Sequence, residues 1–498
     1  MKKVNIVHFL FLLILAVSFF SACSGSKSNN SELRYGLTTE PTTLNPLNPS
    51  NTADGRSILF NIFEGLVKPD VDGTFFPCLA ESWSIEQDAL VYNFTLREGV
   101  LFHDGSIVSP QDIKFSLDTA RNEGFDGLEN IENVVIENNH IKVILKNADP
   151  EFLPYLTIGI VKDDIMDYEN DVIGTGPFYM DSYTPQRNLV LVKFDNYWKK
   201  DLPHLNKITI LFFANYDTLL VALRGGSIDG AFITGSMAAQ LDQKNFDLFN
   251  NRSAAVQLMA LNNSAYQLDD LRVRKAINYG VDVNDIINTA FFGSGSPSGS
   301  PIIPGLSVYY EDSLSYQYNP DLARSLLSEA GYNDKNKFSL EISVPSNYSM
   351  HVDTAQVIVS HLEKIGVNAS IKLVDWSTWL SDVYFGRQYQ ATIISLDSTS
   401  VSPRSFLSRY RSDSGSNFIN FKSEDFDKVY SAALKETNSE RRIKLYKDAQ
   451  RIIAENAAGV YIQDIFSYIA LRGGAYDGVL DYPLYVVDFA SIYGKSNN

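Results

Sequence analysis

The residues that most often carry enzyme chemistry are few in this chain, and none of them falls into a catalytic pattern. The 498 residues include six histidines and two cysteines, without a His-Glu-x-x-His, Gly-x-Ser-x-Gly or Cys-x-x-Cys sequence. His351 and His361 fall on one predicted helical stretch, too far apart to bind one metal ion without help, and we expect both to face solvent. We therefore predict that the protein is not an enzyme and holds no metal and no cofactor.

Polar side chains that suit ligand binding follow one predicted strand, residues 390–396. Asp397, Ser398 and Thr399 come directly after it, and Arg404 follows a few residues later. Ligand sites in α/β proteins lie beyond the carboxyl ends of strands, so this run is the first candidate for a binding site. Arg404 could bind a carboxylate through two parallel hydrogen bonds, or it could lie on the surface of a helix.

The elements expected to position these residues alternate between strands and helices, which predicts a largely parallel sheet. Trp376 and Trp379 fall on one of the helices, after a strand end, where they would form the wall of a pocket or belong to the core. The predicted strands lie at residues 338–344, 367–374 and 390–396, and the helices lie around residues 355–365 and 376–384.

Length and charge restrict the classes of protein to consider. A chain of 498 residues exceeds the roughly 250–300 that one core can serve, so we expect two or more lobes. The net charge is -17, and the chain has no cluster of lysine and arginine. Binding to nucleic acid depends on such clusters, so a nucleic acid partner is excluded.

The N-terminus predicts a lipid anchor. Two lysines precede an apolar run at residues 6–20, which is too short to span a membrane, and Ser21-Ala22 then lead to Cys23. We predict a lipoprotein signal peptide at 1–22, lipid on Cys23 and a polar tether at 23–31. Lipoprotein signals usually carry Leu or a similar aliphatic residue where this chain has Phe20. The alternative is therefore an ordinary secretory signal. With Cys23 lipidated, Cys78 is left without a disulfide partner.

Several short segments occur in an order that resembles the family 5 extracellular solute-binding proteins, the peptide-, dipeptide- and nickel-binding receptors of ABC importers. The resemblance extends from about residue 34 to residue 469. Its segments are FEGL at 63–66, LAESW at 79–83, FTLR at 94–97, FHDG at 102–105, GTGPF at 174–178, DDLRVRKAI at 269–277 and RIKLYKDAQRIIAE at 442–455.

The resemblance implies a fold and a mechanism. The fold is an α/β, periplasmic-binding-protein-like class II clamshell, with two large lobes and a smaller lobe inserted in the first. The resemblance also implies that the lobes close over a solute, and that the closed monomer delivers it to the permease subunits of an ABC importer at the cell envelope. We expect lobe I to comprise residues 32–52, 170–262 and 475–498, lobe II residues 53–169, and lobe III residues 263–474.

The resemblance also implies which residues bind the solute. Peptide-binding members carry Trp-x-x-Asp after the strand at 390–396, and that aspartate binds the ammonium group of the ligand. Leu396 and Thr399 stand at those positions here, so the carboxylate is missing from its expected place. Asp397 could substitute for it, because alternation along a strand puts it on the same side as Thr399. Asn417 matches a position that lies near the cavity in the family.

Three functions remain open from the sequence. The first is capture of peptides for an importer. The second is the same fold binding another solute, such as an oligosaccharide or a metal chelate, because a neutral Ser/Thr patch without the aspartate favours hydroxyl or amide groups. The third is a surface lipoprotein whose main role is adhesion or signalling. The peptide importer receptor is the function that we predict.

Overall fold

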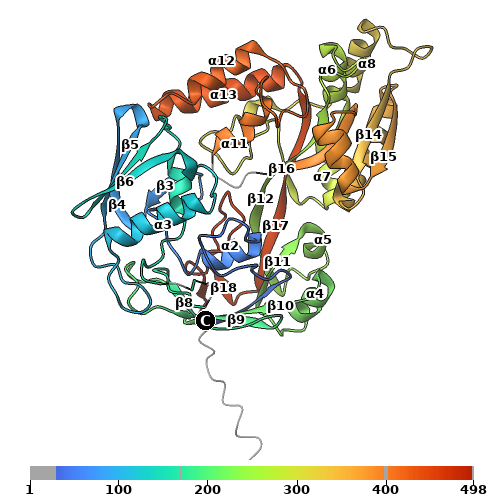
Figure 1. Cartoon of the computed structure of the whole chain (residues 1–498). Coiled ribbons are helices and arrows are strands. Elements are labelled where there is room, and N and C mark those ends of the chain that lie inside the picture. Colours follow the sequence, from blue (N-terminus) through green and yellow to red (C-terminus); the bar gives the residue numbers. More distant parts are fainter. Residues whose placement is uncertain (1–29, 166, 169, 398–401, 496–498) are drawn as a thin grey trace, which may run out of the picture.

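The computed structural model describes residues 30–165, 167–168, 170–397 and 402–495 (Figure 1). Their strands form one large sheet, a separate four-stranded sheet and two small two-stranded ribbons. The mixed α/β class that we predicted is confirmed. Within these residues, no helix is long and apolar enough to cross a bilayer.

The large sheet has eleven strands and runs through the whole molecule. Ten of them form a continuous series, and β13 (Gly295–Pro297) pairs with β17 beside it. The series is β15 (Asn368–Val374), β14 (Ser339–Pro345), β16 (Ala391–Asp397), β12 (Phe246–Leu261), β17 (Gly459–Arg472), β11 (Gly230–Thr234), β1 (Glu32–Leu37), β10 (Lys207–Phe212), β9 (Asn188–Lys193) and β8 (Phe178–Thr184).

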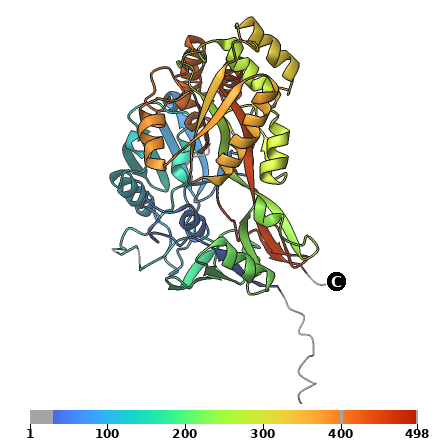
Figure 2. The same cartoon turned by 90° about the vertical axis from the view of Figure 1, so that its right-hand side faces the viewer.

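The two longest strands, β12 and β17, connect the two halves of the sheet (Figure 2). The C-terminal part of β17, residues 467–471, pairs with β11, and the C-terminal part of β12, residues 255–261, pairs with β16. The register between β12 and β17 shifts between Arg252 and Val256. The pairing of β12 with β16 and the pairing of β17 with β11 therefore lie on opposite sides of this irregularity.

The lobe limits predicted from the sequence fall at the ends of these two strands. Residue 262 follows β12 directly, and residue 474 lies two positions after β17. A lobe boundary at residue 262 or 474 assigns the whole of β12 or β17 to one lobe. The strand pairing instead places one part of each strand in each half of the sheet. Neither hydrophobic pattern nor turn residues mark the middle of a continuous strand, so the sequence did not indicate the crossing. The limits themselves stay a prediction.

Lobe II contains the four-stranded sheet and one long helix. Helix α3 (Pro110–Asn122) begins at Ser109, whose side chain and that of Asp112 form the capping box expected for this sequence. On β5, alternate side chains are buried at Tyr92, Phe94 and Leu96, which is typical of a strand with one face on a core. The antiparallel order is β4 (Ala80–Glu86), β5 (Val91–Leu96), β7 (His140–Leu145) and β6 (Ile131–Glu137).

The remaining elements cover the sheets. In Figure 1, α12 and α13 lie across the top of the molecule, between lobe II and lobe III. The helices are α2 (Ala53–Leu59), α4 (Tyr216–Arg224), α5 (Gly235–Ala238), α6 (Leu271–Gly280), α7 (Val283–Phe291), α8 (Pro320–Glu329), α9 (Ser349–Lys364), α10 (Trp376–Thr378), α11 (Pro403–Leu407), α12 (Glu424–Ala433) and α13 (Ser439–Glu455). The two ribbons pair β2 (Val67–Pro69) with β3 (Phe75–Pro77), and β18 (Tyr476–Asp477) with β19 (Tyr493–Gly494).

The hydrophobic cores show which parts are packed together. One cluster joins side chains of lobe I, such as Tyr35 and Phe489, with those of lobe II, such as Phe94. Two other clusters, containing Trp379 and Val273, belong to lobe III. Burial of shared apolar surface holds lobes I and II together as one body. Lobe III has hydrophobic clusters of its own, and β12 and β17 connect it to that body.

The two histidines of helix α9 are buried. Our prediction that they face solvent was wrong. His351 and His361 are each 2% exposed. Gln257 of β12 donates from Nε2 to His351 Nδ1 at 3.0 Å, and His361 Nε2 lies 2.8 Å from Asp285 of α7. Each ring has its own polar partner on a neighbouring element, and that tertiary pairing outweighs the surface preference of histidine. No group of three potential metal ligands comes together in the described ranges.

Burial lowers the pKa of two histidines to about 4, and this predicts acid sensitivity. The two are His351 and His103. At His103 the Gly176 carbonyl and Asp104 raise the pKa, but burial has the larger effect. Unfolded histidine has a pKa of about 6.5, so below that value the unfolded state binds more protons. Stability is then lost as pH falls from 6.5 toward 4, by about 2 kcal/mol for each histidine at pH 5.

Urea unfolding between pH 4.5 and 8 measures this loss. We expect the His351→Gln variant to show a pH slope smaller by about one proton than that of the unsubstituted protein. Gln243→Asn, a change at an exposed residue that does not titrate, is the control and should leave the slope unchanged. Equal slopes in all three proteins would contradict the assignment.

Candidate ligand-binding site

Strand β16 ends beside the register shift between β12 and β17. Its last residue, Asp397, is exposed and lies opposite Ala255 of β12 in the register. Ser398 and Thr399 follow it and lie outside the described residues. Asp397 therefore stands exposed at the carboxyl end of a strand, and its role in binding a solute stays a prediction.

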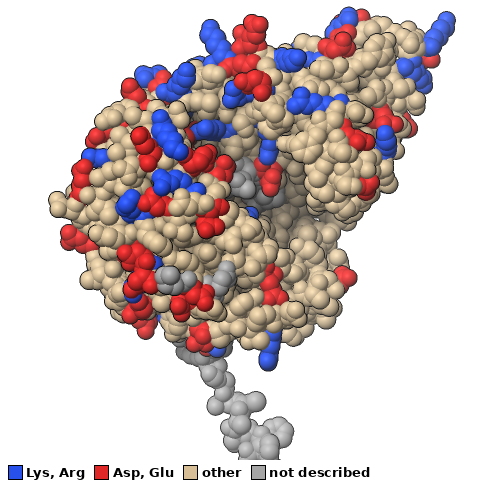
Figure 3. All heavy atoms as spheres, viewed as in Figure 1, with Lys and Arg blue, Asp and Glu red and all other residues tan. Residues whose placement is uncertain are grey.

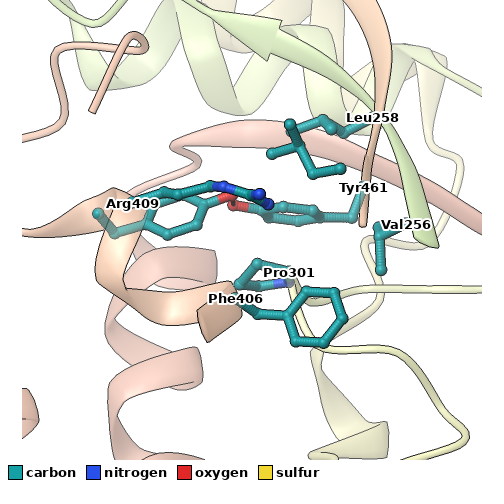
Figure 4. Close-up of a pocket in the computed structure, with 8 residues that line it drawn as sticks. Val256, Leu258, Pro301, Phe406, Arg409 and Tyr461 are labelled. Carbon is teal, nitrogen blue, oxygen red and sulfur yellow. Dashed lines mark hydrogen bonds between the residues drawn. The ribbon is translucent and has the colours of Figure 1, made fainter. Parts of the chain in front are cut away.

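A pocket lies against the same strand end (Figure 4). Leu396 lines it, and because neighbouring strand residues face opposite sides, Asp397 points away from it. The other lining residues come from β12, from the loop that follows β13, from α11 and the turn after it, and from β17. They are Val256, Leu258, Pro301, Phe406, Arg409, Tyr410 and Tyr461.

The polar groups of this pocket are two tyrosine hydroxyls and one guanidinium. Tyr461 donates from its hydroxyl to that of Tyr410 at 2.9 Å, and burial raises the pKa of Tyr410 to about 12. Both phenols are therefore neutral at physiological pH. Arg409 Nη1 is buried, and among the described residues it has no hydrogen-bond partner. Figure 4 shows the guanidinium of Arg409 reaching toward Tyr461 and Leu258.

Arg404, our candidate for binding a ligand carboxylate, is paired within the protein. Its Nη1 lies 2.6 Å from Oδ2 of Asp149, which belongs to lobe II. Burial opposes the charge of Arg404, but the nearby Asp149 carboxylate outweighs it and raises the pKa of the guanidinium. In this structure Arg404 therefore connects lobe III to lobe II, and its guanidinium is occupied.

A second carboxylate of lobe II lies beside this pair. Ser402 donates from Oγ to Glu151 Oε2 at 3.1 Å, and Arg442 Nε of α13 lies 3.8 Å from Oε1. Burial raises the pKa of Glu151, while Tyr446 and Arg442 act in the opposite direction. We call Asp149, Glu151, Ser402, Arg404 and Arg442 the inter-lobe cluster.

The two tryptophans occupy different environments. Trp379 is 3% exposed and donates from Nε1 to Thr392 Oγ1 at 2.9 Å. Trp376 is 38% exposed and stacks on Trp379, with ring centroids 5.0 Å apart and planes at 6°. The indole of Trp379 is thus a core side chain that supports Trp376. Of the two, only Trp376 presents a face that a ligand can reach.

Asn417 stabilises a turn. Its Nδ2 donates to the carbonyls of Arg411 and Phe421 at 2.9 and 2.7 Å, and its Oδ1 accepts from Phe421 N at 3.1 Å. The residue is 3% exposed. These bonds satisfy the amide within the chain, so we do not include Asn417 in the proposed site. Asn417 was named because it matches a position near the cavity in the family, but here its amide completes a turn.

A hollow is visible between the lobes in the space-filling view, with charged side chains at its edges (Figure 3). The sequence did not single out Asp149, Glu151, Arg409, Tyr410 or Tyr461. The segment from 404 to 411 contains three arginines, which is a signal for anion binding, but only the fold shows which of them already has a carboxylate partner.

Comparison with known proteins agrees with this geometry. The model of the bacterial extracellular solute-binding proteins, family 5 Middle, matches residues 74–418. Heme-binding protein A of Haemophilus influenzae is 26% identical over 464 residues, which is 81% of this chain and 84% of that protein. Glutathione-binding protein GsiB of Salmonella typhimurium is 28% identical over 439 residues, covering 83% and 85%.

The fold is shared with a solved structure of the same kind. The unliganded open form of MppA, a periplasmic murein tripeptide binding protein, superposes with a TM-score of 0.83 at 21% identity, over 93% of this chain and 97% of that one. This confirms the clamshell fold expected from the sequence. The chain belongs to the family 5 bacterial extracellular solute-binding proteins, which act in ABC import outside the cytoplasm and are not enzymes.

Proposed function

We propose that this protein captures short peptides by closing lobe III against lobes I and II, with Asp397 binding the ammonium group of the peptide. The position of Asp397 is the observation that carries the proposal. It lies at the end of β16, opposite the irregularity in β12, and no ion pair engages its carboxylate among the described residues. A carboxylate there can form a charge-assisted hydrogen bond with an ammonium group, strongest once closure excludes water.

Three further features support capture by closure. Lobes I and II share one core, whereas lobe III has its own, so the two bodies can move as units. Trp376 offers an exposed aromatic face on lobe III. Two similar proteins bear names of peptide ligands, a murein tripeptide and glutathione. A solute that contacts both bodies stabilises the closed form, because only that form makes both sets of contacts.

The test of Asp397 uses a mixture of synthetic tripeptides with free termini. Asp397→Asn should weaken binding on the order of 10- to 100-fold, because the ammonium loses its charged partner. Native mass spectrometry of the complexes measures occupancy across a concentration series. Asp181→Asn makes the same change of charge on exposed β8 and should bind as the unsubstituted protein does. Unchanged affinity in Asp397→Asn would remove Asp397 from this role.

A non-peptide solute is the second candidate, favoured by Thr399 at the position where peptide-binding members carry aspartate. The relatives include a heme-binding protein, and a solved structure of similar fold, NikZ, holds nickel with histidine. Mass spectrometry of whatever co-purifies with the protein separates the two candidates. Mixed short peptides would support the first, and a single sugar or metal complex the second.

We also propose that the protein is a monomer tethered to the membrane by lipid on Cys23, which lies outside the described residues. The several acyl chains of a bacterial lipoprotein anchor stably, whereas one chain alone binds marginally. Cys23→Ser should therefore move the protein from the membrane fraction to the soluble fraction and abolish labelling with radioactive palmitate. Retention of the label in this variant would contradict the anchor at Cys23.

A further inference from the structure

We infer that lobe III carries a second ligand site, a cavity that binds a neutral sugar ring. The cavity has a volume of about 250 Å³, and the end of α6, the start of α7, the segments 297–299 and 315–318 and the first residues of β17 form its walls. All its lining residues fall within 278–461, so lobes I and II contribute none of them. In Figure 1, α6 and α7 lie on the side of lobe III away from lobe II. The site therefore does not depend on closure of the lobes.

Asn278 of α6 supplies a buried acceptor that lacks a partner. The residue lines the cavity and is 4% exposed. Its Nδ2 donates to Arg274 O at 3.0 Å, but no residue in the described part of the chain donates to its Oδ1. A side-chain amide oxygen that is buried requires a donor. A ligand hydroxyl in the cavity can supply it.

Contacts to the end of α13 hold the walls of the cavity in place. Tyr316 donates from its hydroxyl to Ala454 O at 2.8 Å, and its ring lies edge-on to that of Tyr279, with centroids 4.9 Å apart. Arg274 of α6 donates from Nε and Nη2 to Asn456 O at 3.2 and 3.0 Å. The cavity is thus formed before a ligand arrives, which lowers the entropy cost of binding.

The lining favours a neutral ligand that carries hydroxyl groups. Asp282 is the one charged residue among the described residues that line the cavity, so an anion would be repelled. A single carboxylate is a poor site for a metal ion. The amides of Asn284 and Gln317 and the hydroxyl of Tyr318 are donors as well as acceptors, and a cation would leave those donors without a partner. Sugar hydroxyls both donate and accept, and therefore match this lining.

The volume limits the ligand to about one ring. A water molecule occupies about 30 Å³ in the liquid, so the cavity equals the volume of about eight water molecules. One hexose ring with its hydroxyls suits such a space, whereas most of a tripeptide would lie outside it. The cavity is therefore a different site from the one proposed for peptides.

Titration of the full-length protein with neutral monosaccharides tests the inference. Glucose, galactose and mannose are each followed by saturation-transfer difference NMR, and each is compared with its uronate. At least one neutral sugar should bind with a dissociation constant of about 1 mM or tighter. Its uronate should bind on the order of tenfold more weakly, because Asp282 repels the carboxylate.

Two variants locate the binding. Asn284→Trp introduces a large side chain from an exposed position that lines the cavity, and it should weaken sugar binding more than roughly tenfold. Asn288→Trp, one turn further along α7 and outside the lining, is the matched control and should bind as the unsubstituted protein does. Asn278→Leu removes the buried acceptor and should weaken binding roughly tenfold. Circular dichroism checks that each variant is folded.

Competition separates this site from the cleft between the lobes. The tripeptide mixture should leave the affinity for the sugar unchanged, because the two ligands occupy different sites. Sugar binding that survives Asn284→Trp, or that the tripeptides displace, would overturn the inference and favour a non-peptide solute in the cleft. If no neutral sugar binds the unsubstituted protein, or if the uronates bind as tightly, the inference is overturned while peptide capture stands.

Discussion

Replacing Arg404 by glutamine is expected to let lobe III move away from lobe II and to weaken solute binding. Asp149 is 7% exposed and has Arg404 as its charged partner across the lobes. Without the guanidinium, its carboxylate can regain a favourable environment only by meeting water, which requires the lobes to separate. Arg404 is partly exposed, so we expect the loss of the Arg404–Asp149 pair to cost about 1–3 kcal/mol. The loss of a fully buried pair would cost more.

Small-angle scattering and a mutant cycle measure this effect. The radius of gyration of Arg404→Gln should increase, and the dissociation constant for the tripeptide mixture should rise roughly tenfold or more. Asp149→Asn removes the same ion pair, so it should raise both quantities as Arg404→Gln does. The double variant should raise them no further than either single variant. If the effects of the two single changes simply add, the pair does not hold the lobes together.

Replacing Gly174 by alanine is expected to cost about 3 kcal/mol of stability or more. A Cβ at this position would collide with the carbonyl oxygen of Ile62 and lie 2.8 Å from its carbonyl carbon. Both are backbone atoms, which cannot rotate away as a side chain can. The segment is held on both sides, since Gly176 N donates to Ile62 O at 2.8 Å and His103 N donates to Gly174 O at 2.9 Å.

Gly415 provides the matched control for this substitution. No atom outside its immediate chain neighbours lies within 4 Å of a Cβ added there, so Gly415→Ala should change stability little. Urea unfolding of the two variants gives the difference. Near-equal midpoints would mean that the backbone around Ile62 moves freely and that the GTGPF segment does not fix the junction between lobes I and II.

Local features of the fold were predictable because neighbouring residues determine them. Ser109 and Asp112, three positions apart, cap the same helix. Likewise α12 and α13 each begin after a capping side chain, Ser423 and Asn438. Binary patterns and caps act over a few residues, so the sequence displays them directly.

Much of the candidate site was not predictable, because its contacts join distant residues. Arg404 meets Asp149, which lies 255 positions earlier in the chain. His351 of helix α9 accepts a hydrogen bond from Gln257 of strand β12, and the amide of Asn417 is bonded within a turn. Arg409 differs from Arg404 only in what the fold places beside it. An arginine in the sequence indicates that an acceptor is needed. Only the tertiary structure shows which arginines have an acceptor within the protein.

The central claim is that lobe III closes on a solute by rotation about β12 and β17. Spin labels at exposed Glu132 of lobe II and exposed Lys335 of lobe III report the distance between the two bodies. Double electron–electron resonance should give a shorter and narrower distance distribution once the tripeptide mixture is bound. A distribution that stays the same while native mass spectrometry shows the solute bound would contradict closure.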